Sequence, residues 1–423
     1  MVDVLATHGY WLIGFAALFG FLMAWGIGAN DVANAMGTSV GSKAITIKQA
    51  IIIAMIFEFA GAYLAGGEVT STIRKGIIDS GYFVETPELL VFGMISALLA
   101  AGLWLVLASY LGWPVSTTHS IIGAIVGFAA VGVGTEAVEW GKVGGIVGSW
   151  VVTPAISGII AYLIFQTAQN LIFDKEDPFA AAKKYVPIYM MFAGFIMSLV
   201  TITKGLKHVG IKFSNFEAFT LSILIGLIVA GIGKYFISRV KVNMEATRDD
   251  HYHNVEKIFA ILMVITACCM AFAHGSNDVA NAIGPLAAVV SIVNDPNHDI
   301  SAKAQLAPWI LPLGAVGIVM GLAIFGKRVI ETIGKNITHL TPSRGFAAEL
   351  AAASTVVIAS GTGLPISTTQ TLVGAVLGVG MARGIAALNL GVVRNIVVSW
   401  VITLPAGAGL SIMFFFMIKG IFS

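Results

Sequence analysis

The sequence predicts an all-α polytopic membrane protein. The chain has 423 residues, of which 57% are hydrophobic and only 11% are charged, and its mean hydropathy is +0.90. Soluble domains contain about 25% charged residues, so the composition does not fit a soluble core. Apolar windows of about 17–25 residues, the length that a membrane-spanning helix needs, recur along the whole chain. A duplicated pattern of motifs is the third observation, and it indicates two related halves.

The apolar windows predict where the chain crosses the membrane. We expect spans near 9–27, 45–65, 89–111, 138–166, 186–203, 215–237, 255–273, 307–325, 346–361 and 395–418. Other apolar pieces are too short or too polar at one end to cross simply, namely 30–41, 115–133, 281–293 and 366–382. The first ten residues lack the basic region of a cleavable signal peptide, so we expect the first span to be retained. The net charge of +2 is balanced and says nothing about nucleic acid, and the adjacent Cys268 and Cys269 provide no disulfide framework.

An eight-residue phrase occurs twice with one substitution. The first copy, GANDVANA, begins at Gly28, and the second copy, GSNDVANA, begins at Gly275. Further matched segments follow in the same order, pairing 61–77 with 321–337, 111–127 with 362–378, and 149–154 with 399–405. Such agreement in order indicates a duplication. We expect a first repeat at 1–167, linker loops with two unpaired helices at 168–254, and a second repeat at 255–423.

The repeated phrase brings carboxylates and carboxamides into apolar surroundings, where polar groups are costly and usually functional. On a helix, spacings of three and four residues put these groups on one face. The two faces are formed by Asn30, Asp31 and Asn34 and by Asn277, Asp278 and Asn281. Oxygen ligands of this kind suit a hard cation. The glycine before each phrase could let the helix break and free backbone carbonyls. No His or Cys cluster with transition-metal spacing accompanies the phrases, although His274 is close to the second copy. The alternative is that these side chains only bond neighbouring helices.

A proline followed by hydroxyl residues also occurs twice, as PVSTTH at 114–119 and PISTTQ at 365–370. The pattern predicts the N-terminus of a helix. A half-helix that begins inside the membrane points free N–H groups and its positive dipole end at the cavity contents. We expect a tetrahedral oxyanion to bind there, because clustered hydroxyls add donors without adding fixed charge. The alternative is an ordinary N-cap with hydroxyls bonding back to their own helix.

Two lone carboxylates break the symmetry between the halves. Glu58 lies near the middle of a predicted span and Glu349 opens another, whereas the repeat-equivalent positions are Ile318 and Leu98. Either glutamate could relay protons or cations. Glu58 could instead pair with a buried Lys, Arg or hydroxyl group, and Glu349 could lie in the membrane interface. No nucleotide-binding or nucleophile motif occurs in a suitable context, so we do not expect an enzyme.

These motifs resemble the signatures of the inorganic phosphate transporter family. The resemblance is carried by both copies of the phrase, the second extending through AHGSNDVANAIGP at 273–285, and by both proline–hydroxyl motifs. TIRKGI at 72–77 and GFAAEL at 345–350 add to it, and it covers nearly the whole chain apart from the linkers. The sequence departs from the family at Ser276, where alanine is usual, and at Gln370, where histidine is common. The second departure leaves open whether His119 has a role shared by both halves.

The resemblance implies secondary active uptake of inorganic phosphate by a multi-pass protein of the plasma membrane. It also implies about twelve membrane segments, two inverted repeats, re-entrant helical hairpins and broken helices. Carried over by motif, the sodium ligands are Asn30, Asp31, Asn34, Asn277, Asp278 and Asn281. The phosphate ligands are Ser116, Thr117, Thr118, Ser367, Thr368, Thr369 and Gln370. Glu58, Glu349 and His119 are the candidate coupling residues.

We therefore expect sodium–phosphate symport by alternating access. The expected partners are phosphate, sodium and the lipid bilayer, with no nucleic acid, and a homo-oligomer is conceivable. We expect no cofactor other than the co-transported sodium ions. The alternatives are a proton-coupled symporter of phosphate or metal-phosphate and a related sulfate permease. An anion channel and a structural or receptor-like membrane protein are the competing classes.

Overall fold

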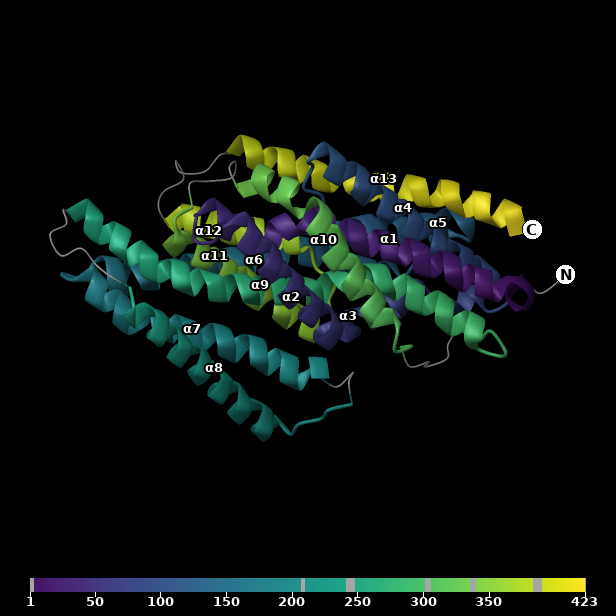
Figure 1. Ribbon diagram of the computed structural model, residues 1–423. Helices are drawn as coiled ribbons and strands as arrows, with labels where there is room; N and C mark the ends of the chain where they lie inside the picture. The colour runs from purple at the N-terminus through teal and green to yellow at the C-terminus, as the bar shows by residue number, and fades with distance from the viewer. Residues whose placement is uncertain are drawn as a thin grey trace.

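The protein is a bundle of long α-helices (Figure 1). The computed structural model describes residues 4–206, 210–240, 248–300, 306–334, 340–382 and 390–422. The helices are α1 (Val4–Gly41), α2 (Ile47–Ala65), α3 (Gly67–Lys75), α4 (Pro87–Leu111), α5 (Thr117–Gly132), α6 (Trp140–Ala168), α7 (Pro178–Thr203), α8 (Asn215–Ser238), α9 (Arg248–Asn294), α10 (Ile310–Gly334), α11 (Pro342–Gly361), α12 (Thr368–Ala382) and α13 (Leu390–Phe422).

The helices are long and apolar enough to cross a bilayer. Nine such spans occur among the described residues, on α1, α2, α4, α6, α7, α8, α9, α10 and α13. The shorter apolar helices α5 and α12, together with α11, complete about twelve segments. The prediction of an all-α polytopic membrane protein is therefore confirmed.

Local sequence explains where several helices begin. Thr46 and Gln49 form a capping box at the start of α2, and Ser214 and Glu217 form another at the start of α8. Asp177 accepts hydrogen bonds from the first N–H groups of α7, which begins with a proline. These side chains satisfy N–H groups that a helix start leaves without partners.

The distribution of polar groups is the reverse of that in a soluble protein. Val151 on α6 and Phe216 on α8 are 73% and 80% exposed, whereas Asp31, Asp278 and Glu349 are 0% exposed. Apolar side chains on the outside fit a hydrocarbon environment, in which the backbone bonds of each helix are satisfied internally. The polar groups of the chain are therefore collected in the middle of the bundle.

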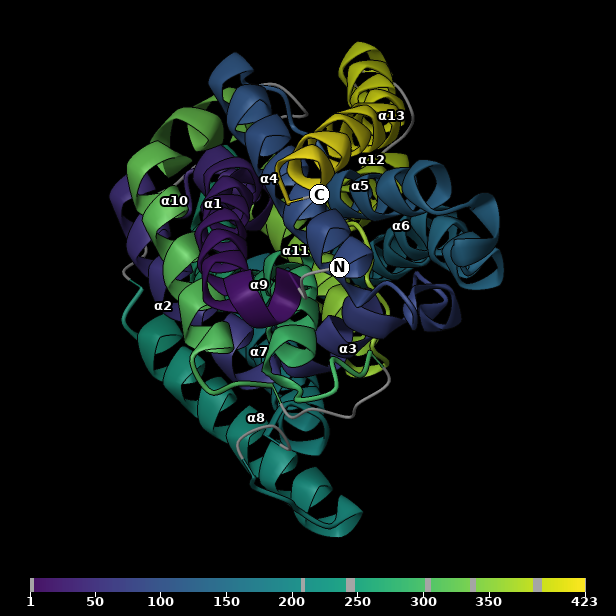
Figure 2. The same ribbon diagram turned by 90° about the vertical axis from the view of Figure 1, so that its right-hand side faces the viewer.

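The two repeats are inverted and interleaved. In Figure 1 α1 and α9 run in opposite directions through the middle of the bundle. Each repeat packs against the other, because α1 contacts α10, α2 contacts α9, α5 contacts α13, and α6 contacts α12. The unpaired helices α7 and α8 pack on each other, and Figure 2 shows α8 projecting beyond the bundle. The repeat boundaries at 1–167 and 255–423 stay a prediction.

The expectation that the helix breaks at the glycine before each phrase is wrong. Helix α1 runs unbroken through Gly28, and α9 runs unbroken through Gly275. These glycines permit close helix contact instead. A Cβ atom on Gly28 would lie 1.9 Å from the backbone oxygen of Ile318, and one on Gly275 would lie 2.2 Å from that of Glu58. The pieces at 30–41 and 281–293 are consequently the ends of α1 and α9.

The break in the helices occurs at the two proline–hydroxyl motifs. Helix α4 ends before Gly112, whose φ of +70° reverses the chain, and α5 begins at Thr117. In the second repeat α11 ends at Gly361, Gly363 has a φ of +73°, and α12 begins at Thr368. A left-handed φ favours glycine, which has no Cβ atom to clash. The apolar pieces at 115–133 and 366–382 are therefore the half-helices α5 and α12 and their N-terminal approaches.

Candidate ion and anion site at the crossing of the repeats

The first carboxamide of each phrase holds a connection between two helices. The Asn30 side chain donates to Ser109 Oγ at 3.2 Å and to Trp113 O at 3.0 Å, and accepts from the Val115 N–H at 3.3 Å. The Asn277 side chain repeats this pattern with Ser360 Oγ at 3.0 Å and Leu364 O at 3.3 Å. It also accepts from the Ile366 N–H at 3.3 Å. Asn30 and Asn277 thus fix the loops that lead into α5 and α12.

The last carboxamide of each phrase reaches into the other repeat. The Asn34 side chain donates to Thr369 Oγ1 at 2.7 Å and to Asp31 Oδ1 at 2.9 Å. The Asn281 side chain donates to Thr118 Oγ1 at 3.1 Å. Each phrase therefore meets the hydroxyl motif of the opposite half, and the two half-sites form one polar centre.

The N-termini of the half-helices α5 and α12 both face this centre. Ser116 and Ser367 are at the N-cap positions, and each side chain accepts the N–H of the residue three positions on at 3.3 Å. Thr117 and Thr368 donate to Asp278 Oδ2 at 3.4 Å and 3.0 Å. The Thr118 hydroxyl donates to the backbone oxygen of Ile366 at 2.9 Å, directly linking the two motifs. Six predicted phosphate ligands are thereby brought together: Ser116, Thr117, Thr118, Ser367, Thr368 and Thr369.

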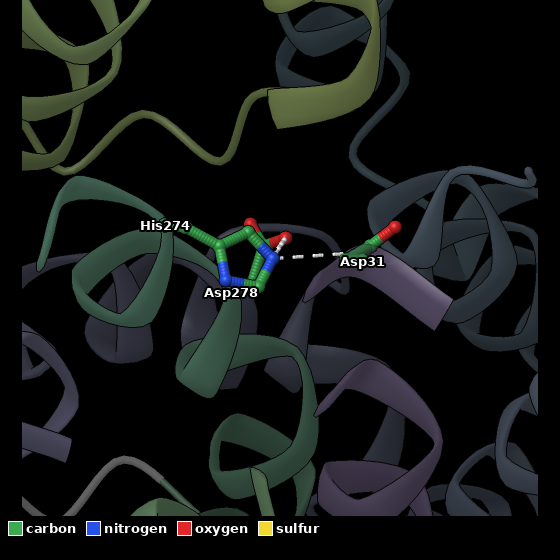
Figure 3. A group of neighbouring side chains, drawn as sticks. All are labelled: Asp31, His274 and Asp278. Atoms are coloured by element: carbon green, nitrogen blue, oxygen red, sulfur yellow. Dashed lines mark ion pairs between the residues drawn. The ribbon is translucent and has the colours of Figure 1, made fainter. Parts of the chain in front are cut away.

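The two aspartates approach the same ring nitrogen of a buried histidine (Figure 3). His274 Nε2 is 3.1 Å from Asp278 Oδ2 on the same helix and 3.8 Å from Asp31 Oδ2 on α1. One ligand atom from each of the three residues lies within 4.8 Å of the others. The sequence did not predict a cluster that includes a histidine, and on this point the expectation is wrong. Its members come from different halves of the chain, so linear spacing could not reveal it.

Glu58 joins this cluster from α2. Its Oε1 atom lies 3.3 Å from His274 Nδ1, and both side chains are 0% exposed. The alternative expected Glu58 to pair with a buried Lys, Arg or hydroxyl group, whereas the group beside it is a histidine. Around the first phrase the positions equivalent to His274 and Glu58 are Ile27 and Ile318, which are also fully buried. The centre thus has symmetric aspartates but an asymmetric histidine–glutamate pair.

Glu349 occupies a separate buried pocket. Its Oε1 atom accepts from Thr38 Oγ1 at 2.5 Å and from Ser39 Oγ at 2.6 Å, and its Oε2 atom accepts from Thr266 Oγ1 at 2.7 Å. Glu349 is 0% exposed and so lies inside the bundle, and the alternative that it lies at the level of the membrane interface stays a prediction. This carboxylate fastens the end of α1 to α9 and α11.

His119 and Gln370 lie outside the aspartate cluster, beside α6 and α13. The His119 ring stacks on Trp150 with centroids 3.7 Å apart, and its Nδ1 atom is 3.5 Å from Trp400 O. Gln370 Oε1 is buried and has no hydrogen-bond partner among the described residues. The contacts of His119 are therefore with α6 and α13 and not with the aspartate cluster.

Five hydroxyl residues that bond to the predicted site residues were not predicted from the sequence, namely Ser109, Ser360, Thr38, Ser39 and Thr266. Ser109, Thr266 and Ser360 are single hydroxyl residues in apolar helices, and Thr38 and Ser39 are neighbours near the end of α1. None of the five belongs to a duplicated motif. Ser109 and Ser360 do stand 251 residues apart at matched points of the repeats, and this spacing could have identified them.

The chain is similar to known membrane transporters along nearly its whole length. A model of the phosphate transporter family matches residues 27–411. A protein of Haemophilus influenzae, named as a proposed phosphate permease, is 58% identical over 425 residues, which cover 100% of both chains. A similarly named protein of Pyrococcus abyssi is 45% identical over 405 residues, covering 96% of this chain and 97% of the relative.

The fold is also found in a solved structure. A sodium-dependent phosphate transporter superimposes with a TM-score of 0.89 at 40% identity, covering 97% of this chain and 99% of that chain. The fold and the relatives are those of a multi-pass membrane transporter rather than an enzyme. The chain therefore belongs to the phosphate transporter family.

Proposed function

We propose that this protein is a sodium-coupled symporter of inorganic phosphate that works by alternating access in the plasma membrane. The single observation that carries the proposal is the crossing of the repeats, in which Asn34 contacts Thr369 and Asn281 contacts Thr118. This crossing joins an acidic group to a hydroxyl-rich helix start in each half. A cation site and an anion site are then contiguous.

The anion would bind between the two half-helix N-termini. The first N–H groups of a helix have no intrahelical partner, and the dipole of the helix favours negative charge there. The first two threonines of α5 and the first two of α12 are at most 2% exposed and lie at this meeting point. They supply hydrogen-bond donors without a basic side chain, so phosphate can be bound and also released.

Bound sodium would lower the free-energy cost of burying the anion at this site. Asp31 and Asp278 lie beside the same hydroxyls, and two adjacent carboxylates repel an anion. The effective penalty for burying one unpaired ion is on the order of several kcal/mol. Cations held by Asp31 and Asp278, with carboxamide and hydroxyl oxygens around them, remove this repulsion. Binding of sodium before phosphate follows from this order of charges.

Inversion of the repeats provides a route for alternating access. Polar sites at the interface of inverted repeats are reached from either side when one set of helices moves against the other. Here the half-helices α5 and α12 pack on α13 and α6, whereas the phrases lie on α1 and α9. We infer that these two sets move relative to each other and that the polar centre lies between them.

Uptake into proteoliposomes tests the proposal. Radioactive phosphate would be followed with an inward sodium gradient, with a proton gradient alone, and with neither. We expect accumulation only with sodium, and we expect Asp31→Asn and Asp278→Asn each to abolish it. Glu85→Gln, which changes an exposed loop carboxylate, is the matched control and should transport normally. Accumulation driven equally well by the proton gradient alone would refute sodium coupling.

The contact between Glu58 and His274 favours one alternative, a proton-coupled carrier. A carboxylate and an imidazole 3.3 Å apart could exchange a proton during the cycle. This alternative predicts that phosphate accumulates in sodium-free medium under an inward proton gradient. Competition by sulfate and arsenate in the same assay defines which oxyanion is carried.

A further inference from the structure

The buried cluster between the repeats contains a nitrogen ligand that a sodium site does not require. Sodium is a hard cation, and carboxylate, carboxamide and hydroxyl oxygens satisfy it. An imidazole beside two carboxylates is instead the donor set of Zn²⁺ and similar divalent metals. We propose that Asp31, His274 and Asp278 form a binding site for one divalent transition-metal ion per chain.

The separations within the cluster match those of metal ligands. Metal–ligand bonds of about 2.0–2.2 Å in a tetrahedral site set neighbouring ligand atoms about 3.3–3.6 Å apart. His274 Nε2 lies 3.1 Å from Asp278 Oδ2 and 3.8 Å from Asp31 Oδ2, on either side of this value. Shifts of a few tenths of an ångström would bring both histidine separations to this range, and the ligand atoms of the two aspartates lie within 4.8 Å of each other. A water molecule or an oxyanion oxygen would occupy the fourth corner.

Unsatisfied polar atoms point to a ligand at this place. Among the described residues, Asp31 Oδ2, Asp278 Oδ1 and both ring nitrogens of His274 are buried without a hydrogen-bond partner of good geometry. Such atoms are costly to bury and are usually paired. The contrast with Glu349 is direct, because both of its carboxylate oxygens accept hydroxyl hydrogen bonds. Among the described carboxylates, the buried oxygens without a hydrogen-bond partner belong to Asp31, Glu58 and Asp278, all around His274.

Glu58 supplies the orienting group that a metal-bound histidine requires. A ligating imidazole commonly turns its second nitrogen toward a carboxylate, which fixes the ring and raises its basicity. Glu58 Oε1 lies 3.3 Å from His274 Nδ1, on the side of the ring away from the aspartates. Glu58 thus acts as a positioning residue for the metal and not as a ligand.

The asymmetry of the repeats sets the stoichiometry. The positions matched to His274 and Glu58 in the duplicated segments are Ile27 and Ile318, so no second site of this kind can form beside the first phrase. Both aspartates are used by the single ion. A bound metal therefore competes with sodium for Asp31 and Asp278, and it should slow sodium-driven uptake.

Binding of Co²⁺ to the purified full-length chain in sodium-free detergent buffer tests the site. We expect one Co²⁺ per chain with the visible absorption of a low-symmetry four- or five-coordinate ion, displaced by Zn²⁺ and weakened by added sodium. His274→Gln should abolish the absorption, and Glu58→Gln should weaken binding about 10–100-fold, the usual cost of losing an outer-shell partner. His253→Gln removes an exposed histidine from the same helix and should bind normally.

The outcomes separate this inference from the proposed transport function. Equal Co²⁺ binding by the His274→Gln and His253→Gln proteins, or absence of binding by the unmodified chain, would overturn the metal site. If His274→Gln does not purify as a folded protein, the shift produced by Glu58→Gln decides, and no shift overturns the proposal. Sodium-driven phosphate uptake measured on the same unmodified preparation reports the transport function independently.

Discussion

The tight contact at Gly28 gives a quantitative test of how the two repeats fit together. Replacing Gly28 with alanine puts a Cβ atom 1.9 Å from the backbone oxygen of Ile318 and 2.7 Å from its carbonyl carbon. Ordinary van der Waals contact begins at 3.4 Å. The obstacle is backbone and cannot rotate away, so α1 and α10 must separate by about 1.5 Å.

Two effects of this separation can be estimated. Overpacking of a close contact costs about 1–3 kcal/mol, which lowers the melting temperature of the Gly28→Ala protein. Asp31 lies three residues further along α1, about 4.5 Å at the helical rise, and moves with it. Misplacement of a functional group by about 1 Å can cost about 100-fold in rate. Phosphate uptake should fall by about this factor.

Gly14 provides the matched control on the same helix. A Cβ atom on Gly14 would have nothing within 4 Å, so Gly14→Ala should retain both stability and uptake. Thermal unfolding in detergent and initial uptake rates in proteoliposomes measure the two quantities. A Gly28→Ala protein that matches Gly14→Ala in both assays would refute the inferred helix contact and the position of Asp31 that follows from it.

Three further predictions concern the polar centre. Asn34→Ala and Asn281→Ala each remove a contact between the repeats. Each should lower the uptake rate about 10-fold or more, which corresponds to about 1.4 kcal/mol. Normal uptake by both variants would contradict the crossing of the repeats. Glu349→Leu leaves three buried hydroxyls without their acceptor and should destabilise the protein by about 1–3 kcal/mol or more, measured by thermal unfolding against Ser222→Ala on α8. Sodium at about 100 times its dissociation constant should stabilise the folded protein by about 2.7 kcal/mol, seen as a higher melting temperature than in choline, and an equal melting temperature would count against a sodium site.

Periodicity and composition were sufficient for the broad architecture. Long apolar windows must form helices in a bilayer because every backbone polar group needs an internal partner there. The proline and hydroxyl residues at 114–119 and 365–370 mark helix starts by local chemistry alone, since Ser116 and Ser367 cap the helices that follow. The duplicated phrases identified Asp31 and Asp278 because carboxylates in apolar segments are exceptional.

The role of a glycine was not decided by local sequence. Gly28 and Gly275 permit either a break or a close contact, and the choice depends on which backbone lies opposite. Ile318 and Glu58, which supply those backbones, are distant in the sequence. For the same reason Thr38 was not predicted as a site residue, because its hydrogen bond to Glu349 joins positions that are far apart in the sequence.

A duplicated, all-helical membrane protein with acidic and hydroxyl motifs in each half could be predicted from the chain alone, because these properties follow from hydrophobicity, short-range spacing and repetition. The tertiary structure was needed to show that the motifs of opposite halves meet. It also shows that Asp31 and Asp278 both lie near Nε2 of His274, whereas Glu58 lies near Nδ1. Contacts between helices depend on how inverted repeats interleave, and this arrangement leaves no signal in the local order of residues.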